Sequence, residues 1–444
     1  MAYNTDRRGL GTHVHDLTEI MSDGLDIFHL PQSDNSIIHG RTIEHHMVTA
    51  LNENNNVFEF VIPSEGHDYT YLPLTRLEGE IQITKANGTP VTNDDFVAPI
   101  NLISSSLFRQ VECEVNGYQV SDLTSPTYHY KAYLETLVTY GLDAKNTHLQ
   151  AALYEPDSIG HEEDFTNTSE SFKIRRNWVL ANGNKLYFST PIFVDFFQSQ
   201  RYLIPGPTIK LKFLKNDDKF CLLSSTSDWK LKINNLTIST RKLKIHDSIT
   251  QKHRELILKQ PALYPLNQSK LRTYVINEGI TAKTLSGVFR GKLPTKAIFG
   301  FVKSKAFNGS YDSNPFLFQP FGVSYIGFLV NGTPYPSRVL QPDFESGKCV
   351  REYRHFLDNV GISHENESNC IGLDRYKTNC TFFAYDLSGD LCNGFHKHAT
   401  DSGFIDIELH FKTALTENIT VVIYGTYDQV VEIDSQGQTK FDTS

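Results

Sequence analysis

Apolar and polar residues alternate with a period of two along much of this chain, which is typical of β-strands with one buried and one exposed face. In the stretch 77–83, Leu77, Ile81 and Ile83 alternate with polar or charged neighbours. Similar alternation occupies 111–115, 209–213, 231–245, 405–411 and 419–424. Dipeptides that suit tight hairpins separate the runs, at Asn87-Gly88, Asn116-Gly117, Asn182-Gly183, Asn308-Gly309 and Asn331-Gly332. The pattern predicts an all-β chain built of antiparallel sandwiches.

Three stretches follow the period of a helix instead. The first is 128–140, which places Tyr130 and Tyr133 on one apolar stripe. The other two are 248–259 and 350–360. We expect these segments to form helices that interrupt the sheets.

The order of these signals is repeated in the two halves of the chain. In each half an Asn-Gly turn precedes a proline-containing loop and then a helix that ends at a glycine. The turns are Asn116-Gly117 and Asn331-Gly332, and the closing glycines are Gly141 and Gly361. The repetition predicts a duplicated domain.

A length of 444 residues exceeds one ordinary core, so we expect two domains. We place a first sandwich at 52–246 and a second at 262–434, joined by a linker helix within 247–261. Residues 1–51 are predicted to form an N-terminal arm, and 435–444 a flexible tail.

The sequence lacks the motifs of several enzyme classes. It has no Walker-type phosphate loop, no Gly-x-Ser-x-Gly nucleophile elbow and no His-Glu-x-x-His helix. The net charge of −9, from 42 basic and 51 acidic residues, argues against a surface devoted to phosphates. These absences weaken several enzyme classes without selecting a function.

Two groups of potential metal ligands are interpreted as incidental. The first is a loop group without the paired short spacings of a zinc site, Cys370, Cys380, Cys392, His396 and His398. The second lies in the arm and is expected to be solvated, His13, His15, Glu44, His45 and His46. No metal site is predicted.

A basic stretch offers a possible contact with nucleic acid, but the solvent face of a sheet explains it better. It comprises Lys230, Lys232, Arg241, Lys242, Lys244, Lys252, Arg254 and Lys259. Three aromatic residues that could stack on bases, Phe193, Phe196 and Phe197, are assigned to the core instead.

No signal peptide is recognised at the N-terminus, and no apolar stretch is long enough to span a bilayer. Six scattered cysteines do not suggest a disulfide framework. We expect a soluble protein made in the cytosol.

Across 25–434 the chain resembles the double jelly-roll (hexon-like) major capsid proteins of Polinton/Maverick elements and adintoviruses. The most specific motifs are the helical stretch Tyr128-His129-Tyr130-Lys131-Ala132-Tyr133-Leu134-Glu135-Thr136-Leu137 and the stretch Phe307-Asn308-Gly309-Ser310-Tyr311. Further matches include Leu25-Asp26-Ile27-Phe28, Phe58 to Pro63, Asp143-Ala144-Lys145, Asn314-Pro315-Phe316, Leu340 to Phe344 and Phe383 to Leu387. One departure is His129, which stands where the family usually has proline.

The resemblance implies two tandem antiparallel jelly-roll sandwiches and a structural function, with no enzymatic activity, no catalytic residues and no cofactor. Such a chain forms pseudo-hexagonal homotrimeric capsomers in the icosahedral capsid of a double-stranded DNA virus or virus-like transposon. Its partners are copies of itself, with separate penton and minor capsid proteins, and it encloses DNA without sequence-specific binding. The location implied is the virion, after synthesis in the host cytosol and assembly there or in the nucleus.

Two other classes remain as alternatives. A lectin-like or cupin-like ligand-binding module also uses a jelly roll, although no clustered His/Glu set marks a cupin site. A glycosidase built on a sandwich requires two inward carboxylates, and nothing in the sequence selects a pair.

The arm and two long loops carry further expectations. Leu25, Ile27 and Phe28 are predicted assembly contacts, docking on a neighbouring jelly roll or beneath the shell; the alternative is packing on their own domain. The loops 154–177 and 364–379 are rich in Glu, Asn and Ser, and are predicted to be exposed.

Overall fold

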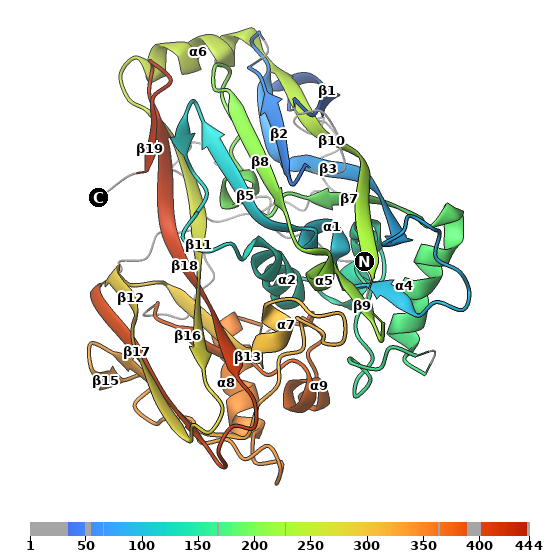
Figure 1. The fold of residues 1–444 in the computed structure, drawn as a ribbon. Helices are drawn as coiled ribbons and strands as arrows, with labels where there is room; N and C mark the ends of the chain where they lie inside the picture. The colour runs from blue at the N-terminus through green and yellow to red at the C-terminus, as the bar shows by residue number, and fades with distance from the viewer. Residues whose placement is uncertain are drawn as a thin grey trace, which may run out of the picture.

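The computed structural model describes residues 34–48, 55–64, 66–166, 168–226, 228–362, 365–388 and 401–441. Two β-sandwiches lie side by side, one formed by the N-terminal half of the chain and one by the C-terminal half (Figure 1). All the strand pairs within the sheets are antiparallel. Among the described residues no helix is long and apolar enough to cross a membrane.

The first sandwich pairs two four-stranded sheets. One sheet has the order β1 (Ile37–His46), β10 (Trp229–Ile245), β3 (Tyr69–Lys85) and β7 (Lys185–Pro191). The other has the order β2 (Val57–Ile62), β8 (Ile209–Lys215), β5 (Phe108–Val115) and β6 (Tyr118–Gln119). A small additional sheet joins β4 (Val97–Pro99) to β9 (Leu222–Ser224).

The second sandwich repeats the arrangement. Its first sheet has the order β11 (Ala262–Ile276), β18 (Ile419–Ile433), β13 (Lys296–Lys303) and β16 (Phe383–Asp386), with β19 (Thr439–Phe441) added on β18. Its second sheet has the order β12 (Ala282–Lys292), β17 (Ser402–Phe411), β14 (Val323–Val330) and β15 (Thr333–Pro334).

The two sandwiches share one topology. When β4, β9 and β19 are set aside, each has eight strands, and the sheet orders in both are first-eighth-third-sixth and second-seventh-fourth-fifth. That order is the double Greek key of a jelly roll. The predicted all-β fold with two tandem jelly rolls is confirmed, and we call them the first and second rolls.

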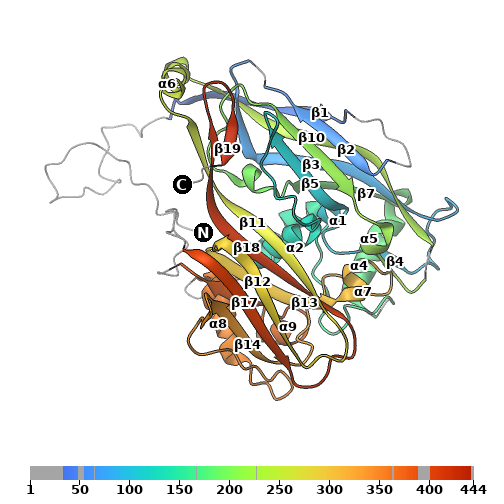
Figure 2. The same cartoon turned by 60° about the vertical axis from the view of Figure 1, so that its left-hand side comes forward.

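The three predicted helices are present as α2 (Tyr128–Thr139), α6 (Asp247–Ile257) and α8 (Val350–Val360). α2 and α8 follow the fifth strand of their respective rolls. The short helices α1 (Ile103–Ser106) and α7 (Ser304–Phe307) also correspond, because each lies between the third and fourth of the eight strands. α6 connects the rolls (Figure 2).

The structure contains further helices that the sequence patterns missed: α3 (Leu142–Lys145), α4 (Glu170–Leu180), α5 (Asp218–Cys221) and α9 (Leu373–Thr378). α4 and α9 fall partly or wholly within the two loops that were predicted to be exposed. That prediction holds for 159–161 and 365–368, which are exposed, but is wrong where large side chains pack inward, since Tyr154, Phe172 and Tyr376 are buried. The prediction rested on the mostly polar composition of these segments, which contain a few large side chains that pack inward.

Two boundaries differ from the expected domain limits. β1 lies within 1–51 and forms the edge of a sheet against β10, whereas this range was expected to be an arm. Most of its side chains are exposed or half-buried, so it lacks the clear alternation by which other strands were found. β19 lies within the expected tail 435–444 and pairs with β18.

Equivalent hairpins close on equivalent Asn-Gly turns. Asn116 and Gly117 have φ of 51° and 82°, and Asn331 and Gly332 have φ of 51° and 80°. Positive φ at both central residues is characteristic of a type I′ turn. Each asparagine Oδ1 also accepts a hydrogen bond from the chain near the seventh strand, from Thr208 N at 2.8 Å and from Phe404 N at 2.9 Å.

The left-handed turn at Gly332 provides a test of the second roll. A Cβ at Gly332 meets no atom within 4 Å, so alanine adds only backbone strain. We expect Gly332→Ala to lower the free energy of unfolding by about 1 kcal/mol in urea denaturation. Gly332→Asn is the control and should lose less, because asparagine enters the left-handed region more readily. Equal losses from the two variants would contradict this account.

Candidate functional site: the interface between the two rolls

α2 of the first roll is buried against the second roll. Its buried residues include His129, Tyr130, Lys131 and Tyr133. The Tyr130 ring stacks on Phe307 with centroids 5.3 Å apart, and the Tyr133 ring stacks on Phe316 at 4.0 Å. The Tyr130 hydroxyl donates to Pro315 O at 2.9 Å. These contacts hold the segment after α7 against the helix.

A hydrophobic core joins the rolls. One cluster of buried residues contains Phe60, Phe108 and Tyr130 from the first roll together with Phe316 and Phe382 from the second. A separate cluster fills the interior of the second sandwich. Sliding one roll over the other would expose part of this shared core to water, at a cost of about 25 cal/mol for each Å² of apolar surface.

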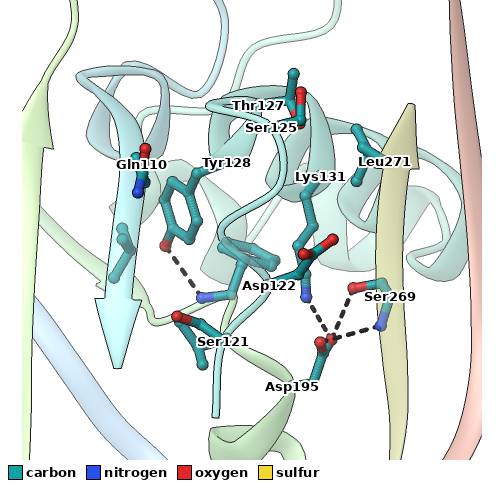
Figure 3. A pocket seen from close by; sticks show the side chains of 13 residues that line it. Gln110, Ser121, Asp122, Ser125, Thr127, Tyr128, Lys131, Asp195, Ser269 and Leu271 are labelled. Atoms are coloured by element: carbon teal, nitrogen blue, oxygen red, sulfur yellow. Dashed lines mark hydrogen bonds and ion pairs between the residues drawn. The ribbon is translucent and has the colours of Figure 1, made fainter. Parts of the chain in front are cut away.

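A buried polar network crosses the same interface (Figure 3). We define the inter-roll network as Lys131, Glu135, Asp195, Ser269 and Tyr424. Lys131 Nζ bonds Asp195 Oδ1 and lies 3.0 Å from Glu135 Oε1, one helical turn along α2. Asp195 starts a short 3-10 helix, Asp195–Gln198, and accepts hydrogen bonds from Ser269 N at 3.0 Å and Ser269 Oγ at 2.8 Å.

Ser269 is on β11, so the Asp195 carboxylate of the first roll is bonded directly to a strand of the second roll. A second link runs from Tyr424 on β18, whose hydroxyl donates to Glu135 Oε1 at 3.0 Å. Gln198 Nε2 donates to the other Glu135 oxygen at 2.8 Å. The network therefore holds one ammonium and two carboxylates, with partners from both rolls.

The charges in the network depend on one another. Burial alone would lower the pKa of Lys131, but attraction to Asp195 and Glu135 outweighs it and raises this pKa. Burial raises the pKa of Glu135, against the opposing attraction of Lys131. Burial, with a smaller effect of the Glu135 and Asp195 charges, also raises the pKa of Tyr424, which keeps its hydroxyl protonated as a donor.

A second buried ion pair lies elsewhere on the interface. Arg175 Nη2 on α4 is 2.6 Å from Asp157 Oδ1, and the two side chains are 2% and 6% exposed. Asp157 Oδ2 also accepts from Asn314 Nδ2 of the second roll at 3.2 Å. Nearby, Lys303 Nζ lies 2.7 Å from Glu163 Oε2. The segment before α4 is thereby held against the second roll.

Two further contacts connect the halves. Lys145 Nζ donates to Leu137 O at 3.0 Å and to Asn369 O at 2.6 Å, and burial lowers its pKa to about 8. At the C-terminus, Phe441 N donates to the Tyr118 hydroxyl at 3.3 Å, and their rings meet edge-on. β19 thus bridges from β18 to the β5–β6 hairpin of the first roll.

The interface leaves little free space around the network. The cavity beside Lys131 and Asp195 has a volume of about 40 Å³, which holds a water molecule or two but no organic substrate. Each charged group in the network is already matched by a partner across or along the interface. Together, the hydrogen bonds and ion pairs across the interface fix the orientation of the two rolls relative to each other.

Of the residues considered above as potential metal ligands, the structure describes Glu44, His45, His46, Cys370 and Cys380. Leu25, Ile27 and Phe28 lie outside the described residues, as do His13, His15, Cys392, His396 and His398. Cys370 is partly exposed and Cys380 is buried. His45 is buried on β1 and bonds Thr240 Oγ1 at 2.9 Å. Among the described residues no group of three or more His, Cys, Asp or Glu is placed to hold a metal ion.

The basic stretch is only partly a solvent face. Lys230 and Lys244 are exposed, as expected for a sheet surface. Lys242 differs, because it is buried and donates to Thr70 Oγ1 at 2.9 Å. The assignment of Phe193, Phe196 and Phe197 to the core is confirmed by their burial.

Sequence reasoning missed the polar part of the interface. Lys131 and Glu135 form an i,i+4 pair, which in a sequence has the appearance of an ordinary surface pair on a helix. Their position beside Tyr130 and Tyr133 was the available signal, because a charged pair among large aromatics points to burial. Asp195 and Arg175 had no comparable signal, since their partners are distant in sequence.

Comparison with solved structures places the fold among viral capsids. The chain is similar to a quasi-atomic model of the PBCV-1 virus capsid, with a TM-score of 0.60, 12% identity, and coverage of 94% of this chain and 99% of that one. It is similar to the Sputnik virophage structure, with a TM-score of 0.61, 11% identity, and coverage of 96% and 93%. For the mavirus major capsid protein the TM-score is 0.50, identity 10% and coverage 96% of both chains.

The fold is therefore the double jelly roll found in viral major capsid proteins. Among curated sequences, the chain is 27% identical over 392 residues to the uncharacterized protein F54H12.2 of Caenorhabditis elegans, covering 85% of this chain and 91% of the relative. No family model matches the sequence.

The inter-roll network predicts a large effect of removing its single cation. We expect Lys131→Met to lower the free energy of unfolding by about 3–5 kcal/mol, because Glu135 and Asp195 are left buried without a counter-charge. Lys173→Met is the control, since the Lys173–Glu170 pair is largely exposed, and should change stability by less than about 1 kcal/mol. Chemical denaturation measures both, and similar losses would contradict a buried network.

His129 predicts a loss of stability in acid. Burial lowers its pKa to about 3 from 6.5, and its ring packs on Phe220 with centroids 4.3 Å apart. As the pH falls below 6.5, the unfolded chain binds a proton that the folded chain refuses. This group therefore lowers the free energy of unfolding by up to about 1.4 kcal/mol per pH unit.

His129→Phe keeps an aromatic ring at this position and removes the titration. We expect the variant to lose less stability than the native protein between about pH 7 and about pH 4 in urea unfolding. Parallel pH profiles of the two proteins would show that His129 does not control the acid response.

Proposed function

We propose that this chain is a non-enzymatic major capsid protein that forms homotrimers and tiles the facets of an icosahedral capsid around double-stranded DNA. The single observation that carries the proposal is that two rolls of identical strand order are locked into one rigid unit. The likeness in fold to capsid proteins across more than nine-tenths of the chain supports it.

The geometry gives a physical reason for this role. Two similar wedges in one chain, repeated around a three-fold axis, produce six wedges and an outline with near six-fold symmetry. Such a block packs among like blocks in a flat facet through closed, symmetric contacts. The orientation of the rolls within the chain has to be fixed, and the aromatic stacks and buried ion pairs of the interface supply that rigidity.

We further propose that the chain comes from a Polinton-type element or an adintovirus. The motifs named above carry this proposal, and several of them lie at the roll interface, among them Tyr130, Tyr133, Lys145, Phe307 and Phe316. A relative in a nematode supports it as well, since a transposon-borne capsid gene is expected to occur in animal genomes.

The remaining parts of the proposal follow from a capsid role. Separate penton and minor capsid proteins would complete the shell at its five-fold vertices. DNA would be enclosed without base-specific contacts, and the final location would be the virion after synthesis in the host cytosol.

Sedimentation of the purified full-length chain tests the proposed assembly. We expect a species with the mass of three chains at micromolar concentration, and pseudo-hexagonal particles in negative-stain images. Subunit contacts of obligate type should bury about 2,000 Å² or more, so the trimer should persist on dilution. A monomer at every salt concentration tested, with no larger particle, would overturn the proposal.

A further inference from the structure

An apolar groove lies where the two rolls and the connecting helix meet. We define the α6 groove by Ile37, Tyr202, Ile249, Leu256, Leu263 and Tyr264, which are among the residues that line it. Its volume is about 730 Å³, within the size range of sites that bind organic ligands or peptide side chains. The walls come from the start of β1, the start of β11 and one face of α6.

The groove leaves large apolar side chains open to water. Leu256 is 47% exposed, Leu263 is 44% exposed and Tyr202 is 38% exposed. Thr250 is the buried residue on α6, so the apolar side of this helix lacks the cover that an amphipathic helix normally has. Contiguous exposed apolar surface of this kind marks a binding surface more often than a free one.

The chain itself enters at the edge of the groove. Ser36 and Ile37, at the start of β1, are both lining residues. Asp34 Oδ1 accepts a hydrogen bond from Ser36 N at 2.9 Å, which is a local turn directly before the strand. Upstream of it, the sequence Pro31-Gln32-Ser33-Asp34-Asn35 consists largely of turn-forming residues.

An apolar segment precedes these turn residues. Leu25, Ile27, Phe28 and Leu30 stand in a part of the chain that is otherwise largely polar. Between Leu30 and Ser36 there are six residue steps, which span up to about 20 Å when extended. The segment is therefore tethered at the groove at high effective concentration, whereas a neighbouring copy would have to bring its own segment to the same place.

We propose that residues 25–30 fold back and dock in the α6 groove of their own chain. The segment covers the exposed leucines of α6 and β11, while Arg201, His253 and Glu432 line the same groove as polar partners for its backbone and for Asp26. The inference selects packing on the chain's own domain over docking on a neighbouring roll. It concerns the folded chain and does not depend on shell formation.

Photo-crosslinking of the full-length protein tests the occupant. A photoreactive amino acid replaces Leu256 in the groove or, as the control, Leu258, which is 76% exposed and does not line the groove. Equal amounts of nitrogen-15-labelled and unlabelled protein are unfolded, mixed and refolded together before irradiation, so that any oligomer contains both isotopes, and crosslinked peptides are identified by mass spectrometry.

We expect position 256 to crosslink to a peptide containing residues 25–30, with both peptides carrying the same isotope, and position 258 to give at least several-fold less of this product. Mixed-isotope pairs would show that a neighbouring copy supplies the segment and would overturn docking within the chain. Equal yields at both positions, or no crosslink to residues 25–30, would overturn the groove as the binding site.

Hydrogen exchange gives a second readout that does not require the introduced probe. We expect Ile27→Asp to increase exchange of the α6 amides about tenfold or more, because an aspartate cannot be buried in the groove without a partner. Thr18→Asp, outside the apolar segment, is the matched control and should leave α6 unchanged. Unchanged α6 exchange in Ile27→Asp would overturn the proposal, and sedimentation of the same sample shows separately whether trimers form.

Discussion

The structure depends on keeping α2 buried between two sandwiches while it carries a lysine and a glutamate. Removing these charges from water is costly, and the cost is offset only when Lys131, Glu135 and Asp195 meet at short range with Ser269 and Tyr424 as additional partners. The geometry that satisfies all of them fixes the second roll against the first. The aromatic stacks of Tyr130 and Tyr133 add apolar area to the same contact.

The two rolls share one topology but differ in how their helices pack. α2 and α8 occupy the same place in the topology, yet α2 is buried along most of its length while α8 buries only Glu352, Phe356 and Asn359. α2 is therefore buried between the two rolls, whereas α8 remains half-exposed. His129 belongs to the buried helix, and burial lowers the pKa of its imidazole.

Local sequence patterns predicted much of the fold. Alternation located β3, β5, β8, β10, β17 and β18, and the helical period located α2, α6 and α8, because each pattern reflects one buried face along a short stretch. β1 was missed because an edge strand with few buried side chains has no strong alternation. α4 was missed because its buried residues, Phe172 and Arg175 among them, are interspersed with polar ones that dominate the composition.

The sequence by itself determined the class of fold, the repeated order of its elements and the Asn-Gly turns that close equivalent hairpins, since all of these depend on residues close together in the chain. Only the tertiary structure decided that Lys131 meets Asp195, that Arg175 meets Asp157 and that an apolar groove forms beside the start of β1. The sequence alone does not show whether a charged side chain will be solvated or buried. That distinction arises only when distant segments come together and exclude water.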